Sequence, residues 1–133
     1  MLDTNTVSYI LKGKSPAARA KLAALEHNEI ACISAITEAE LHYGVARRPN
    51  NPALVASLEA FLSKIQILGW GRDEAKAYGR LRAKQEATGK TLGNLDMLIA
   101  AHVIAIGGVL VTNDKSFAQV PDLGGTVNWA TDL

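Results

Sequence analysis

Short apolar segments alternate with longer amphipathic segments along most of this 133-residue chain, and this alternation limits the folds that it can adopt. Apolar strands are predicted at residues 1–3, 29–34 and 109–114, with a strand or edge segment at 66–70 and a last short strand at 125–129. Helices are predicted at residues 4–13, 15–28, 35–47, 53–65, 72–90 and 94–108. Strands that are separated by helices pair in parallel, with helices on both faces of the sheet. The pattern therefore predicts an α/β protein.

Helix ends are predicted from capping residues. Thr4 or Asn5 is available to cap the first helix, and Asn94 is expected to cap the helix that starts there. Gly89 and Gly107 are expected to end the last two helices, since glycine accepts the left-handed conformation that follows many helices.

The length and composition are those of one compact globular domain over residues 1–133. The formal net charge of +1 gives no overall attraction to nucleic acid or to an anionic membrane, so any polyanion must meet local basic patches. The longest apolar run, residues 103–111, is too short to cross a bilayer, and the first residues do not read as a signal peptide. We therefore expect a cytoplasmic protein without membrane contact.

Cysteine and histidine usage excludes other chemistry. Cys32 is the single cysteine and has apolar neighbours, which predicts a buried thiol rather than a reactive one. The three histidines, His27, His42 and His102, lack the spacing of zinc ligands. His42 and His102 lie on or beside apolar helix faces, which favours structural roles for both.

Four acidic residues lie near the carboxyl ends of predicted strands or in the first turns of helices: Asp3, Glu40, Asp96 and Asp114. Because parallel strands point their carboxyl ends at one edge of the sheet, these four side chains are expected to share one pocket. Carboxylates that converge repel one another unless a cation or protons separate them. An all-oxygen ligand set suits Mg²⁺ or Mn²⁺, and such a site predicts metal-assisted hydrolysis of phosphodiester bonds.

Each acid also has a structural interpretation. Asp3 could cap the helix that follows it, although Thr4 or Asn5 is available for that role. Asp96 could only complement the positive end of its helix dipole, and Asp114 could be a turn residue. For the last two residues the sequence leaves both interpretations open.

Glu38 and Glu40 are two residues apart on one predicted helix, so they point in different directions. The inward face of that helix is predicted from four residues, Ile36, Ala39, Tyr43 and Ala46. Glu40 follows Ile36 by four residues and shares its face, which makes it the expected ligand. Glu38 is then a charge in solvent.

Several stretches together resemble one known family: "MLDTN", "ISAITEAELHYG", "TLGNLDMLIAAHVIAIGGVLVTNDKSFAQVPDL" and the closing "VNW". They resemble the PIN-domain ribonucleases, and specifically the VapC toxins of bacterial type II toxin-antitoxin systems, over essentially the whole chain. The resemblance implies a three-layer α/β/α sandwich with a short central parallel sheet. It also implies an endoribonuclease that uses Mg²⁺ or Mn²⁺, held by Asp3, Glu40, Asp96 and Asp114. Many relatives have asparagine at the last position.

The resemblance implies supporting residues and partners as well. Asn5 and Thr112 correspond to polar residues that support the metal-binding carboxylates. Similar proteins are homodimers, and a cognate VapB antitoxin lays its carboxy-terminal segment across the toxin and can place an arginine near the acids. The RNA substrate that it implies is tRNA, with initiator tRNA cut in the anticodon loop as the leading expectation.

RNA bound beside an acidic pocket needs a basic rim. The candidates are Lys12, Arg47, Arg48, Arg80, Arg82 and Lys90. For any one of them a solvated charge is the simpler interpretation, whereas the set makes RNA contact plausible.

Other classes of function fit less well. A haloacid-dehalogenase phosphatase needs a second aspartate where Asn5 stands, and a receiver domain needs a central phospho-acceptor aspartate that the stretch from residue 48 to 72 lacks. A catalytically inactive PIN-like module that binds RNA or antitoxin is the remaining alternative. The retention of all four acids argues against it.

Overall fold

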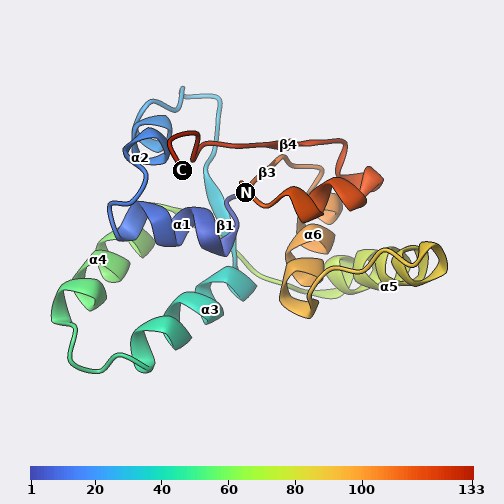
Figure 1. The fold of residues 1–133 in the computed structure, drawn as a ribbon, viewed down its shortest axis with the longest axis horizontal. Helices are drawn as coiled ribbons and strands as arrows, with labels where there is room; N and C mark the ends of the chain where they lie inside the picture. The colour runs from blue at the N-terminus through green and yellow to red at the C-terminus, as the bar shows by residue number, and fades with distance from the viewer.

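The computed structural model describes residues 1–133, and its short strands lie between two groups of helices (Figure 1). On one side lie α1 (Thr4–Leu11), α2 (Pro16–Ala23), α3 (Ala35–Ala46) and α4 (Pro52–Leu62). On the other side lie α5 (Arg72–Thr88) and α6 (Asn94–Ile106). The strands are β1 (Cys32–Ser34), β2 (Gln66–Leu68), β3 (Leu110–Val111) and β4 (Thr126–Val127), and two 3₁₀ turns, η1 (Lys115–Gln119) and η2 (Pro121–Leu123), follow β3.

The first three residues of the chain join two parallel strand pairs, β1 with β2 and β3 with β4. The Leu2 amide donates to the Cys32 carbonyl at 2.9 Å, and the Asp3 amide donates to the Val111 carbonyl at 3.0 Å. Residues 1–3 therefore lie between β1 and β3, where Leu2 forms a parallel bridge with Val111. The predicted first strand is thus the centre of the sheet, although it is only a few residues long.

Side chains of the central strands alternate between the two faces of the sheet, as strand geometry requires. Met1, Cys32 and Leu110 pack into a core beneath α5 and α6. Their neighbours in the chain, Leu2, Ile33 and Val111, pack into a second core against α1 to α4. This arrangement confirms the predicted three-layer α/β/α sandwich, and Cys32 is buried as expected.

Two predicted helix caps are wrong. Asp3, not Thr4 or Asn5, caps α1, because its extended backbone lets Oδ1 accept the Thr6 amide at 2.8 Å. Gly93 precedes α6, and Asn94 is already its first helical residue. Gly89 and Gly107 do end α5 and α6, with φ angles of 69° and 63°.

The predicted inward face of α3 is also wrong. Thr37 and Leu41 are the buried residues of this helix, whereas Ala39 and Ala46 are exposed and Tyr43 is 65% exposed. Most faces of α3 carry apolar residues, so periodicity alone did not identify the side that packs against α1. None of the helices is both long and apolar enough to cross a membrane.

Candidate metal centre

The four predicted acids come from four segments and meet at the carboxyl edge of the sheet. Asp3 ends the central strand, Glu40 lies in the second turn of α3, Asp96 in the first turn of α6, and Asp114 just after β3. Burial and, after it, the negative charges of Asp114, Glu40 and Asp3 raise the pKa of Asp96 above its usual value of 3.8. Because three charges act on the fourth carboxyl group, all four belong to one site.

Asp3 is the most firmly held of the four. It is buried, its Oδ1 accepts the Thr6 amide, and its Oδ2 accepts the Thr112 hydroxyl. The Thr112 oxygen also accepts the Asp114 amide at 3.0 Å. Asp114 in turn caps η1 through a 2.9 Å bond from the Ser116 amide to Oδ1. Thr112 thereby connects two acids that stand at opposite ends of the chain.

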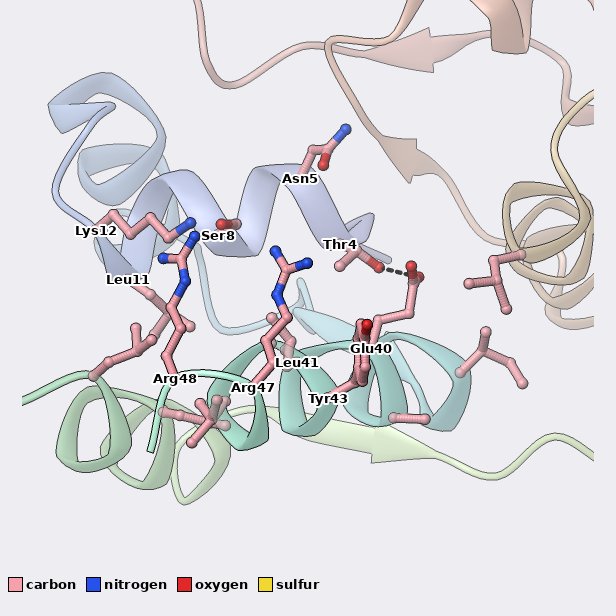
Figure 2. A pocket seen from close by; sticks show the side chains of 17 residues that line it. Thr4, Asn5, Ser8, Leu11, Lys12, Glu40, Leu41, Tyr43, Arg47 and Arg48 are labelled. Atoms are coloured by element: carbon pink, nitrogen blue, oxygen red, sulfur yellow. Dashed lines mark hydrogen bonds between the residues drawn. The ribbon is translucent and has the colours of Figure 1, made fainter. Parts of the chain in front are cut away.

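Glu40 is oriented by Thr4, whose hydroxyl donates to Glu40 Oε1 at 2.6 Å (Figure 2). Thr4 Oγ1 also lies 3.3 Å from the hydroxyl oxygen of Thr37. Asn5, expected to support the carboxylates, forms no hydrogen bond with any of them, and Figure 2 shows its side chain pointing away from Glu40. Sequence analysis missed Thr4, and its position next to Asp3 was the signal available.

The donor set fits a hard divalent cation. None of the four acids forms an ion pair with lysine, arginine or histidine. Asp96 has no hydrogen-bond donor on its carboxylate, so these oxygens are available as ligands. No three side chains of the Asp, Glu, His and Cys types already surround a common point closely enough to hold an ion. The chemistry of the cluster thus suits Mg²⁺ or Mn²⁺, while the side chains would draw together to bind it.

Glu38 lies apart from this cluster. Its Oε2 is 3.5 Å from Nε2 of His42, one turn along the exposed side of α3. It is not among the charges that raise the pKa of Asp96. The two glutamates of α3 therefore have different surroundings, as the sequence predicted.

A groove of about 550 Å³ adjoins Glu40 between α1, α3 and α4 (Figure 2). Its apolar lining includes Leu11, Leu41, Val45, Leu54, Leu58 and Leu95. Lys12, Arg47 and Arg48 also line it, and Figure 2 shows their charged ends gathered between α1 and α3. Partial burial and the charges of Arg48, Lys14 and Arg47 lower the pKa of Lys12. This concentration of positive charge makes the groove a suitable place for an anion.

The six basic candidates are divided by the structure. Arg80 lines a different cavity, beside Ile104 near the end of α6, and Arg82 is paired with Glu86 at 2.9 Å. Lys90 lines a third cavity, with Lys84 and Asp122. Only Lys12, Arg47 and Arg48 gather at the groove beside Glu40.

Carboxylates converging at the carboxyl edge of a short parallel sheet, inside an α/β/α sandwich, define a class of protein. The chain belongs to the PIN domain family, whose model matches residues 1–123.

Within that family its relatives are toxin-like ribonucleases. "Ribonuclease VapC2" of Rickettsia felis is 37% identical over 124 residues, which is 92% of each chain. The "tRNA(fMet)-specific endonuclease VapC" of Shigella flexneri is 32% identical over 131 residues, covering 98% of this chain and 97% of the relative. The structure of VapBC2 from Rickettsia felis, bound to a promoter DNA fragment, matches with a TM-score of 0.90 and 36% identity over 97% of both chains. DNA-bound VapBC from Salmonella typhimurium matches with a TM-score of 0.88 at 32% identity, over 97% of this chain and 96% of that one.

Proposed function

We propose that this chain is an endoribonuclease toxin of a VapBC-type toxin-antitoxin pair, which hydrolyses RNA phosphodiester bonds with Mg²⁺ or Mn²⁺. The observation that carries this proposal is the convergence of Asp3, Glu40, Asp96 and Asp114 with no basic side chain to neutralise them. Relatives named ribonucleases, which align with nearly the whole chain, support the same class of reaction.

The four carboxylates would hold the metal. When bound, such an ion makes water nucleophilic near neutral pH and stabilises charge on the phosphate oxygens. The chain's own contribution is to place the carboxylates: Thr6 and Thr112 orient Asp3, and Thr4 orients Glu40. The raised pKa of Asp96 reflects repulsion that a cation would relieve. No side chain is assigned as a general base.

The RNA backbone would lie across Lys12, Arg47 and Arg48, which bring positive charge to the groove beside Glu40. Relatives from Shigella flexneri and Salmonella typhimurium, each 32% identical, are named tRNA(fMet)-specific endonucleases. We therefore take tRNA as the substrate class and initiator tRNA as the first target to test.

The same groove suits an antitoxin segment. Its floor is apolar and its rim is cationic, so a peptide with apolar side chains and an acidic or carboxylate group would be held there. The similar structures are VapBC complexes, and a cognate VapB-type antitoxin is the partner that we propose for this groove. An antitoxin bound there would exclude RNA. We expect the free toxin to be a homodimer.

The test is cleavage of bulk tRNA by the purified protein in Mg²⁺, in Mn²⁺ and in a chelator, with the new 5′-phosphate ends mapped by sequencing. Discrete ends that need metal and are absent with Asp96→Asn support the nuclease. If a folded protein produces no ends from tRNA or from total cellular RNA, the non-catalytic binding module replaces this proposal.

A further inference from the structure

The imidazole of His102 connects three elements around the candidate metal centre. His102 is completely buried in α6, and its Nδ1 lies 2.8 Å from the hydroxyl oxygen of Ser34. Ser34 is also completely buried, ends β1 and caps α3 by accepting the Ile36 amide at 3.1 Å. On the other side of the ring, Nε2 lies 3.5 Å from Oε1 of Glu74, in the first turn of α5.

The proton positions follow from these partners. Burial lowers the pKa of His102, so its ring is neutral at pH 7 and carries a single N–H. Ser34 Oγ accepts a backbone amide, which leaves its own proton to be donated to Nδ1. The ring proton is then on Nε2, which has no hydrogen-bond partner and faces the Glu74 carboxylate.

A serine, a histidine and a glutamate in this order resemble a hydrolase triad, but the surroundings exclude that role. The Ser34 side chain is completely buried, so a substrate has no access to its oxygen. The chain of contacts is therefore structural in form, and its position decides what it does.

That position relates the two helices that carry the central acids. Ser34 lies six residues before Glu40 on the segment that starts α3, and His102 lies six residues after Asp96 on α6. Six helical residues span about 9 Å, so each carboxylate is less than two turns from the Ser34–His102 contact. A shift of the start of α3 would move Glu40 relative to Asp96.

We propose that His102 is a positioning residue, which holds the start of α3 through Ser34 and so sets Glu40 in register with Asp96. The inference rests on the proposed function for its catalytic meaning, whereas the contact between His102 and Ser34 does not. Displacements of about 1 Å in such sites can reduce rates about 100-fold. Partners that orient metal ligands typically change metal affinity about 10- to 100-fold when removed.

Three substitutions separate this role from core packing. His102→Asn places an amide close to the position of Nδ1, His102→Gln places one towards Nε2, and His102→Leu supplies neither. We expect His102→Asn to keep Mn²⁺ affinity, measured by calorimetry, within about threefold, and the Gln and Leu variants to lose about tenfold or more. Cleavage per folded molecule should follow, and amides of residues 36–38 should exchange hydrogen faster in Gln and Leu than in Asn.

The opposite result is clear. If all three variants bind Mn²⁺ alike, or lose affinity in proportion to their loss of stability, His102 only fills the core and the proposal is wrong. If the variants do not fold, nitrogen NMR of the wild-type histidine ring decides, since a proton on Nδ1 would contradict the contact. A wild-type protein that neither binds Mn²⁺ nor cuts RNA overturns the proposed function, while the exchange at residues 36–38 still tests the positioning of α3.

Discussion

The hydroxyl of Thr112 donates a hydrogen bond to Oδ2 of Asp3, across 109 positions in the chain. The same oxygen accepts the amide of Asp114, so one buried side chain orients two of the four carboxylate residues. The contact lies between the central strand and the end of β3. It ties the geometry of the site to the pairing of the sheet.

Thr112→Val removes the hydroxyl while keeping the shape of the side chain. We expect Mn²⁺ affinity and RNA cleavage to fall about 10- to 100-fold, because Asp3 loses the donor that orients it. The free energy of unfolding should fall by about 1–3 kcal/mol, since buried polar groups lose their partners. Thr112→Ser keeps the hydroxyl and is the matched control. Equal behaviour of the two variants in calorimetry and cleavage would show that the hydrogen bond does not matter.

Asp96→Asn should abolish cleavage and stabilise the metal-free fold. The folded state raises the pKa of Asp96, so its contribution to stability is present below pH 3.8 and is lost as pH rises through the folded pKa. At pH 7 the ionised group is therefore a cost that asparagine removes. Urea unfolding with a chelator at pH 7 should show a gain of about 1 kcal/mol. A less stable variant, or one that cuts at the wild-type rate, would contradict this assignment.

Glu40→Gln and Glu38→Gln form a matched pair on one helix. Glu40 belongs to the acidic cluster, so its loss should reduce metal-dependent cleavage about 100-fold or more. Glu38 faces His42, and its substitution should change the rate by less than about twofold. The check is the cleavage rate at saturating Mg²⁺. Similar losses in both variants would mean that the two glutamates share one role.

Neutralising Lys12, Arg47 and Arg48 together with glutamine should weaken RNA binding and its salt dependence. Each lost phosphate contact on a single strand lowers the slope of log affinity against log salt by about 0.7, so the triple variant should lose about 2. RNA binding is measured in an Asp96→Asn background, where RNA stays intact. Arg80→Gln with Arg82→Gln is the control, since these residues lie away from the groove. A change of slope in the control equal to that in the triple variant would remove the groove as the binding surface.

The stability of the protein should fall in mild acid because of His102. Burial lowers its pKa below 6.5, so the unfolded state takes up a proton that the folded state resists. The stability is present above pH 6.5 and is lost as pH falls from there towards the folded pKa. His102→Asn lacks this effect, so its difference from wild type should narrow between pH 7 and pH 5. Urea midpoints at pH 7, 6 and 5 test this, and a constant difference would mean that the ring titrates normally.

The sequence by itself determined the class of fold and the place of the four acids. Apolar strands separated by helices can only pair in parallel with helices on both faces, and this is a local property of the chain. Because Asp3 and Asp114 directly follow strands, any such sheet brings them to the same edge. The ends of α5 and α6 were also local, since Gly89 and Gly107 accept positive φ angles.

The tertiary structure alone decided the contacts that orient the site. It selected Thr4 over Asn5 as the partner of Glu40, separated Lys12 from Arg80, and placed His102 against Ser34. Each of these depends on how a helix is rotated about its axis when it packs. In α3 most faces are apolar, so hydrophobic periodicity carried no information about that rotation. Packing against α1 and the sheet, between residues far apart in sequence, supplied it.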